Sequence, residues 1–170
     1  MKKRNIILVG FMGTGKTVTG RLLAERTGME LVDMDSLIES RQGKTIPQIF
    51  AESGETGFRV LERNLVQELS KRDGLIISTG GGVVLNSDNI ADFEKTGLVV
   101  CLTASPETIF QRVEKDTNRP LLSGDKKTQI SLLLEKRKPL YSAIAHGINT
   151  DGLTDTQTAD LILELYALES

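Results

Sequence analysis

The sequence predicts an α/β fold in which helices cover both faces of a parallel β-sheet. Two observations predict it: short apolar runs rich in β-branched residues are typical of buried strands, and segments with helical spacing lie between them. Because strand and helix alternate, we expect right-handed crossovers, a parallel sheet, and ligands at the carboxyl ends of the strands. The expected strands are residues 6–9, 29–32, 75–77, 98–102 and, more weakly, 144–149.

The segments between these strands carry helix signals. Leucines recur at helical spacing in residues 58–69 and again in residues 161–168. Ser105 followed by Pro106 predicts a helix start, and Gly28 predicts a helix end. Residues 115–127 are polar and interrupt two helical patterns, so we expect a mobile loop there.

Composition limits the classes of function. The 21 basic and 23 acidic residues give a net charge of −2, so we expect no nucleic-acid or membrane partner. Cys101 is the only cysteine, which excludes an internal disulfide and a cysteine-built metal site within the chain. The apolar run at residues 6–9 is too short for an export signal, and no stretch approaches the ~20 apolar residues of a membrane span. We therefore expect one cytoplasmic, monomeric domain over residues 1–170.

Residues 10–17, Gly-Phe-Met-Gly-Thr-Gly-Lys-Thr, fit the phosphate-binding pattern G-x-x-x-x-G-K-[ST] between an expected strand and an expected helix. The glycines let backbone amides turn toward phosphate, the helix N-terminus adds its positive dipole end, and Lys16 reaches the β- and γ-phosphates. A glycine-rich turn that binds nothing is the alternative, and the flanking strand and helix disfavour it. The expected nucleotide-binding residues of this segment are Gly13, Thr14, Gly15, Lys16, Thr17 and Val18.

Such a loop serves GTPases, motor ATPases and small-molecule kinases alike. The guanine-reading pattern Asn-Lys-x-Asp is absent from the sequence, which disfavours a GTPase. The chain is also too short for the additions of larger ATPases. A compact kinase for metabolites or nucleotides is the class that remains.

Two carboxylates follow the second expected strand. Asp33 and Asp35 are two residues apart, so on an extended strand they project on the same side at its carboxyl end. Asp35 can accept hydrogen bonds from an acceptor hydroxyl and take its proton, while Asp33 can hold a water of a Mg²⁺ shell beside the Thr17 hydroxyl. The alternative for Asp35 alone is that it caps the following helix.

The third expected strand runs into Gly80, Gly81 and Gly82, which lack side chains and let a small polar ligand approach backbone amides. A flexible turn is the alternative. This strand ends without the acidic residue that supports the metal in many phosphate-loop proteins, so Asp33 is the available candidate.

Three arginines stand out by context, because guanidinium groups suit carboxylates and phosphates. Arg59 lies near a helix start with Glu62 three residues on, Arg119 precedes a proline in the expected mobile loop, and Arg137 is expected at a helix end before Pro139. Each can instead be a solvated surface charge, and spacing alone does not choose among them.

In order and spacing, these motifs resemble the shikimate kinase family. The resemblance extends from residue 5 to about residue 141, and the glycine triplet with its two flanking arginine motifs is its most specific part. It implies the three-layer P-loop NTPase fold of nucleoside-monophosphate kinases, with a five-stranded parallel sheet, helices on both faces and a mobile lid. It also implies transfer of the ATP γ-phosphate to the 3-hydroxyl of shikimate, a step of aromatic amino-acid synthesis.

The resemblance further implies roles for single residues. Asp35 would bind substrate hydroxyls and act as base, and Arg59, Arg137 and the backbone at Gly80, Gly81 and Gly82 would hold shikimate. Arg119 would come from the lid, about residues 112–127, and meet the ATP phosphates, while Arg112 would lie near the adenine. The implied catalytic residues are Lys16, Asp35 and Arg119, the implied Mg²⁺ residues are Thr17 and, through water, Asp33, and the substrate-binding helices lie in about residues 34–62.

Two alternatives stay open at this point. One is another small-molecule kinase of the same fold, similar to a gluconate or nucleotide kinase. The other is a nucleotide-binding regulator that performs no chemistry.

Overall fold

The computed structural model describes residues 4–114 and 126–169 of the chain. The strands are β1 (Asn5–Gly10), β2 (Glu30–Asp33), β3 (Leu75–Ser78), β4 (Gly97–Thr103) and β5 (His146–Asn149). The helices are α1 (Lys16–Thr27), α2 (Met34–Gln42), α3 (Ile46–Leu69), the 3-10 helix η1 (Val83–Leu85), α4 (Ser87–Thr96), α5 (Pro106–Val113), α6 (Lys126–Ser142) and α7 (Asp155–Glu169). The expected strands and the expected helix boundaries at Gly28 and Ser105 are confirmed.

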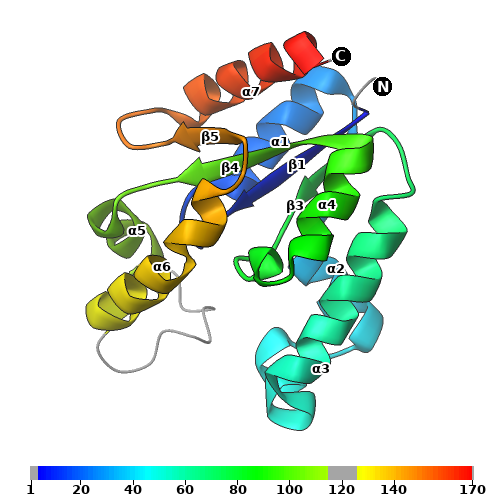
Figure 1. Cartoon of the computed structure of the whole chain (residues 1–170), viewed down its shortest axis with the longest axis vertical. Helices are drawn as coiled ribbons and strands as arrows, with labels where there is room; N and C mark the ends of the chain where they lie inside the picture. The colour runs from blue at the N-terminus through cyan, green and yellow to red at the C-terminus, as the bar shows by residue number, and fades with distance from the viewer. Residues whose placement is uncertain (1–3, 115–125, 170) are drawn as a thin grey trace.

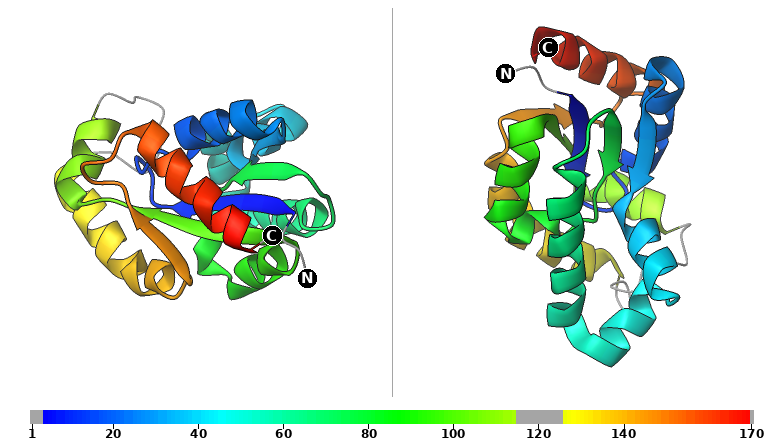
Figure 2. Two further views of the ribbon diagram at one scale, coloured as in Figure 1. Left: turned by 90° about the horizontal axis from the view of Figure 1, so that it is seen from above. Right: turned by 90° about the vertical axis from the view of Figure 1, so that its right-hand side faces the viewer.

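The five strands form one sheet in the order β2-β3-β1-β4-β5, and every neighbouring pair is parallel. Helices α1 and α7 cover one face, while α3, α4 and α6 cover the other (Figures 1 and 2). The strand order reverses direction at the central strand β1, because β3 lies on one side of it and β4 on the other. In such sheets a ligand crevice opens at the carboxyl ends of the strands beside this point.

The core explains why the strands are continuously apolar. Successive residues of a strand point to opposite faces, and here both faces are covered by helices. Ile7 and Val9 of β1 pack in the layer of Phe93 from α4, whereas Leu8 packs in the opposite layer with Leu23 of α1. All five side chains are fully buried. The two cores hold the sheet rigid under the loops at its carboxyl edge.

Local signals account for where several helices begin and end. Ser105 accepts a hydrogen bond from the Thr108 N–H, and Pro106 occupies the first helical position of α5. Thr45 and Gln48 form a capping box at the start of α3. That helix is interrupted at Gly54, whose φ of 69° and ψ of 179° are not helical, so α3 consists of two segments with a kink between them.

Two expectations about local structure are wrong. Asp35 does not lie on an extended strand with Asp33, because β2 ends at Asp33 and Asp35 is in the first turn of α2. The residue that caps α2 is Asp33, whose side chain accepts from the Ser36 N–H. The helix that carries Arg137 does not end before Pro139 either, since Pro139 lies inside α6, which continues to Ser142.

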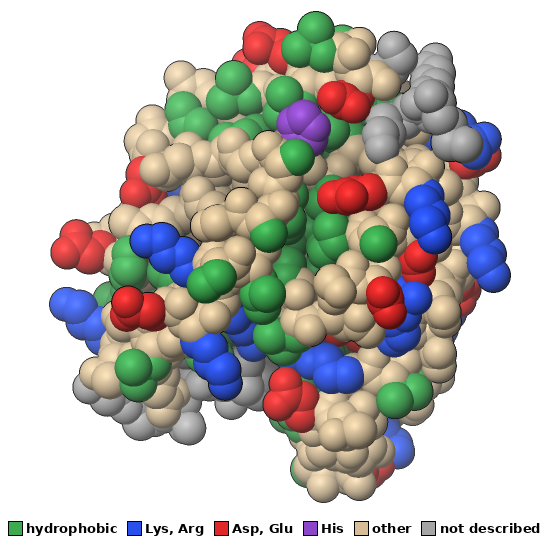
Figure 3. Space-filling model, in the orientation of Figure 1, with side chains coloured by type: hydrophobic (Ala, Val, Ile, Leu, Met, Phe, Trp, Pro, Cys, Tyr) green, Lys and Arg blue, Asp and Glu red, His purple; other side chains and the backbone are tan. Residues whose placement is uncertain are grey.

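On the face shown in Figure 3, Lys and Arg side chains are interspersed with Asp and Glu rather than gathered into one basic patch. Within the described ranges, no helix has the length and apolar character that crossing a membrane requires.

Candidate active site

The phosphate-binding loop joins β1 to α1 at the carboxyl edge of the sheet. Gly13 and Gly15 have φ angles of 76° and 93°, a region that residues with a Cβ rarely adopt. The buried Thr14 hydroxyl donates to the Phe11 carbonyl at 2.7 Å, which closes the loop on itself. Gly15 is the cap residue before α1, so the positive end of this helix dipole lies at the loop.

The side chain of Lys16 lies across this loop. Its Nζ donates to the carbonyl oxygens of Gly10 and Phe11, the latter at 3.2 Å. The ammonium group is therefore already at the loop where phosphate is expected to bind. Val18, the last of the expected nucleotide-binding residues, lies in the first turn of α1 with 45% of its surface exposed.

Thr17 and Asp33 meet beside the loop, as expected. The Thr17 hydroxyl donates to Asp33 Oδ2 at 3.3 Å, while Asp33 Oδ1 caps α2 through Ser36 at 3.1 Å. The hydrogen bond from Ser36 fixes the orientation of the Asp33 carboxylate, so that Oδ2 faces Thr17 at the phosphate loop. A hydroxyl and a carboxylate are hard oxygen ligands that suit Mg²⁺. Among residues 4–114 and 126–169, there is no group of three or more His, Cys, Asp and Glu that could hold a metal ion by itself.

The glycine triplet lies between three polar side chains. A Cβ added to Gly80 would lie 2.8 Å from Asp35 Oδ1, and a Cβ added to Gly82 would collide with the guanidinium of Arg59. At Gly81, an added Cβ would lie 3.4 Å from Arg137 Nη1. Each glycine therefore lies against a different one of the side chains that the sequence singles out. At Gly80 and Gly82 an added Cβ would displace the neighbouring side chain, whereas at Gly81 it would make an ordinary contact.

The backbone of the triplet has its carbonyl groups occupied. The carbonyl of Gly80 accepts from the Val83 N–H at 3.2 Å, that of Gly82 from the Leu85 N–H at 3.0 Å, and that of Gly81 from the Tyr141 hydroxyl at 2.6 Å. Among the described residues, none of the three glycine N–H groups donates to a backbone carbonyl outside the helices and strands. Such N–H groups can donate to an acceptor oxygen of a side chain or of a ligand.

Arg59 lies on α3, five residues beyond the kink at Gly54, and is held by two carboxylates. Its Nη1 lies 3.1 Å from Oε1 of Glu62, which is buried, and its Nη2 lies 3.3 Å from Oε1 of the exposed Glu55. Burial raises the pKa of the Glu62 carboxyl, and the charge and hydrogen bonds of Arg59 oppose this shift. Glu62 thus orients Arg59, as the spacing of the two residues predicts.

Arg137 is not a solvated surface charge, because only 6% of its surface is exposed. Its guanidinium lies over the ring of Phe11, 5.9 Å from the ring centre. One turn further along α6, the Tyr141 hydroxyl reaches Gly81. Arg137 is therefore enclosed by the phosphate loop, the glycine triplet and its own helix.

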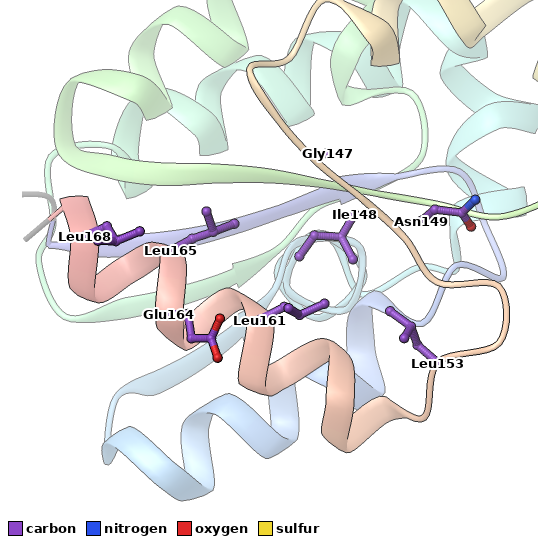
Figure 4. Close-up of a pocket in the computed structure, with 8 residues that line it drawn as sticks. All are labelled: Gly147, Ile148, Asn149, Leu153, Leu161, Glu164, Leu165 and Leu168. Atoms are coloured by element: carbon purple, nitrogen blue, oxygen red, sulfur yellow. The ribbon is translucent and has the colours of Figure 1, made fainter.

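Arg59 and Arg137 face one cavity of about 160 Å³, lined by Phe50, Glu55, Arg59, Leu85, Leu133, Lys136 and Arg137. A second cavity of about 390 Å³ lies between β5 and α7 and contains none of the expected site residues (Figure 4). Its lining includes Ile148 of β5 and three leucines of α7, Leu161, Leu165 and Leu168. The smaller cavity is the one whose lining includes expected site residues, Arg59 and Arg137.

Arg112 of α5 contacts the phosphate loop from the other side. Its Nη1 donates to the Gly13 carbonyl at 2.9 Å and reaches the Thr150 hydroxyl at 3.4 Å. Residues 150–152 are tied to the start of α5, because both carboxylate oxygens of Asp151 accept from the Ser105 N–H at 3.1 Å. This hydrogen bond lowers the pKa of Asp151. Arg112 thus lies beside the phosphate loop, and its expected place near the adenine stays a prediction.

Arg119 and most of the expected lid, residues 112–127, lie outside the described residues. Cys101 is buried in β4 as expected, and burial raises the pKa of its thiol to about 11.

Sequence reasoning assigned no role to Tyr141 or Phe11, although both contact expected site residues. The spacing of Arg137 and Tyr141, four residues apart on one helix, is the signal that places them on the same face. No comparable signal exists for Phe11, because its contact with Arg137 joins positions 126 residues apart in the sequence.

Comparison with known proteins agrees with this geometry. A family model described as shikimate kinase matches residues 12–167. A shikimate kinase from Thermodesulfovibrio yellowstonii is 42% identical over 164 residues, which cover 96% of this chain and 95% of the relative. One from Pelotomaculum thermopropionicum is 44% identical over 161 residues, which cover 94% of each chain. The crystallised shikimate kinase from Acinetobacter baumannii in complex with shikimate has a TM-score of 0.90 and 41% identity, and the match covers 96% of this chain and 92% of that one.

Proposed function

The chain belongs to the shikimate kinase family, and we propose that it transfers the γ-phosphate of ATP to the 3-hydroxyl of shikimate across the crevice between the phosphate loop and the glycine triplet. It is an ATP-dependent kinase with an alcohol acceptor. One observation carries the assignment of the site: Asp35, Arg137 and Arg59 each lie against one glycine of the triplet, directly beside the phosphate loop.

The chemistry of the acceptor fits this pocket. Shikimate carries one carboxylate and three hydroxyls, so it needs cationic donors for the acid and acceptors for the hydroxyls. Arg59 and Arg137 line one cavity and supply the cationic donors. The N–H groups of Gly80, Gly81 and Gly82, which lie beside these side chains, are further donors for the same ligand.

Asp35 is the base in this proposal. Its carboxylate lies at Gly80, the glycine of the triplet that is nearest in the chain to the end of β3. A hydroxyl held by Asp35 donates its proton to the carboxylate as the bond to phosphorus forms. The phosphoryl group passes in line toward this oxygen as the bond from the γ-phosphorus to the β,γ-bridging oxygen breaks and ADP leaves. Lys16 and the amides of the phosphate loop stabilise the charge on the transferred oxygens.

The residues around Thr17 fit Mg²⁺. This ion takes one or two protein oxygens and completes its shell with waters and phosphate oxygens, which is what Thr17 and the capping carboxylate of Asp33 offer. When bound, Mg²⁺ neutralises charge on the phosphates. Arg119 as a lid arginine, a single domain over residues 1–170, a monomeric state and a cytoplasmic location stay predictions.

The direct test is ADP release by the purified chain with ATP and Mg²⁺, with and without shikimate. We expect rapid ADP release only with shikimate, and a product phosphorylated at the 3-hydroxyl. Release with gluconate or a nucleoside monophosphate instead would indicate another kinase of this fold. Nucleotide binding without ADP release under any of these conditions would indicate a regulator.

A further inference from the structure

Tyr141 is a buried residue of α6 that the reaction described above does not use. Only 5% of its surface is exposed, and its hydroxyl donates to the Gly81 carbonyl at 2.6 Å. Burial raises the pKa of Tyr141 to about 12, while the charge and side-chain hydrogen bonding of Arg137 oppose this shift. The hydroxyl therefore keeps its proton, and remains a donor, throughout the neutral pH range.

Gly81 is the glycine at which the two halves of the site meet. A Cβ added there would lie 3.4 Å from Arg137 Nη1, 3.8 Å from the Met12 nitrogen and 3.9 Å from the Gly10 carbonyl oxygen. The same peptide thus lies against the phosphate loop on one side and the acceptor pocket on the other. A rotation of this peptide would displace the Arg137 guanidinium and change the direction of the N–H groups beside it.

The hydrogen bond to Gly81 joins two parts of the chain that are 60 residues apart. The carbonyls of Gly80 and Gly82 accept hydrogen bonds from nearby N–H groups of the 3-10 helix η1, those of Val83 and Leu85. The carbonyl of Gly81 instead has the Tyr141 side chain as its donor. Local backbone structure therefore holds the two ends of the triplet, and a tertiary contact holds its middle.

We propose that Tyr141 is a positioning residue, whose hydroxyl holds the Gly81 peptide and the neighbouring Arg137 guanidinium in the orientation that receives the carboxylate of the acceptor. The proposal rests on the proposed function, because it assigns Arg137 to the acceptor. Tyr141 itself does not touch the reacting atoms. It acts through Gly81 and Arg137.

The variant that tests it is Tyr141→Phe, which keeps the ring in the core and removes only the hydroxyl. Loss of a buried hydrogen bond to the Gly81 carbonyl is expected to weaken shikimate binding about fivefold to tenfold, with ATP binding changed less than about twofold. Titration calorimetry with each ligand measures both effects. The other tyrosine of the chain provides a matched control, because Tyr166→Phe removes a hydroxyl that reaches the Arg4 carbonyl at 3.3 Å, far from the site.

A double-mutant cycle with Arg137→Met separates positioning from general packing. If Tyr141 acts through Arg137, Tyr141→Phe changes shikimate affinity less than about twofold in the Arg137→Met background. An equal loss in both backgrounds would overturn the proposal, and so would a Tyr141→Phe protein that binds shikimate like the parent.

The parent protein is measured in the same series. A parent that phosphorylates shikimate while Tyr141→Phe has no effect overturns only the role of Tyr141, and the proposed function stands. A parent that neither binds nor phosphorylates shikimate overturns both.

Discussion

The donor and acceptor halves of the site are built in different ways. The donor half consists of one contiguous segment, residues 10–17, whose backbone and side chains bond to one another through Thr14 and Lys16. The acceptor half takes Asp35 from α2, Arg59 from α3, Arg137 from α6 and the glycine triplet after β3. In the proposed function, a local loop binds the phosphate groups that all phosphate-loop kinases share, whereas side chains from distant segments recognise the acceptor.

This contrast has a consequence for mutation. Changes in the acceptor half should alter shikimate binding or turnover and leave ATP binding nearly intact. Changes on the donor side should weaken ATP binding and leave shikimate binding nearly intact.

Asp35→Asn should have the largest effect. It keeps the shape of the side chain but removes the proposed base at Gly80, and general bases contribute about 10²-fold to 10⁴-fold to rate. We expect kcat to fall by that factor while ATP affinity is unchanged, as measured by steady-state kinetics and ATP titration. The matched control is Asp88→Asn, another carboxylate in the first turn of a helix. A kcat of Asp35→Asn close to that of the parent would remove Asp35 from the chemistry.

Gly82→Ala should have the next largest effect. The new Cβ would collide with the Arg59 guanidinium, while the φ of −94° at Gly82 is allowed for alanine. Because the colliding atoms are the end of a flexible side chain, we expect the fold to persist and Arg59 to be displaced. Shikimate affinity should fall about tenfold, or about 1.4 kcal/mol, without a comparable loss of ATP affinity.

The control for this variant is Gly147→Ala, at which the added Cβ would come no closer than 4.0 Å to the Cys101 carbonyl. Melting temperatures of both variants should match the parent. Unchanged shikimate affinity in Gly82→Ala would contradict the proposed acceptor half of the site. It would mean that the glycine triplet and Arg59 do not bind the same ligand.

Glu62→Gln should weaken shikimate binding by a smaller factor, about fivefold, because the neutral amide holds Arg59 less firmly than the carboxylate. It should also change how stability depends on pH. The pKa of Glu62 is raised above its ordinary value of 4.5 in the folded protein, so its contribution to stability is present below that pH and is lost as pH rises through the raised pKa. A glutamine does not titrate.

The free energy of unfolding of Glu62→Gln, relative to the parent, should therefore increase as the pH rises from about 4 toward neutrality. Chemical denaturation at several pH values measures this trend. Glu55→Gln, which removes the exposed carboxylate partner of Arg59 instead of the buried one, serves as the control. A pH trend of the opposite sign would contradict the assignment of a raised pKa to Glu62.

Arg112→Ala should have the smallest effect, and this effect should be on ATP binding rather than on shikimate binding. It removes the hydrogen bond to the Gly13 carbonyl at an exposed position, so we expect ATP affinity to fall about threefold with shikimate affinity unchanged. Arg21→Ala, on the exposed surface of α1, is the control. A larger loss of shikimate than of ATP affinity would contradict the division of the site into two halves.

Much of the fold could be predicted because its signals are local. The apolar run of β1, the serine before Pro106 and the glycine after α1 each act through neighbouring residues, and all three are where the sequence predicts them. The errors at Asp35 and Pro139 have a common cause. At Asp35, the strand β2 passes into the helix α2 without an intervening turn. At Pro139, the helix α6 continues past a proline. The spacing of residues in the sequence shows neither event.

From the sequence alone, the phosphate loop, the alternation of strands and helices and the identity of the polar residues were determined, because contiguous patterns carry them. Only the tertiary structure decided that Arg137 is buried against the ring of Phe11, that Glu62 is buried beside Arg59 and that each glycine of the triplet lies against a different polar side chain. These contacts join segments brought together by the order of the parallel strands, and the free energy of burying each side chain depends on neighbours that are distant in the chain.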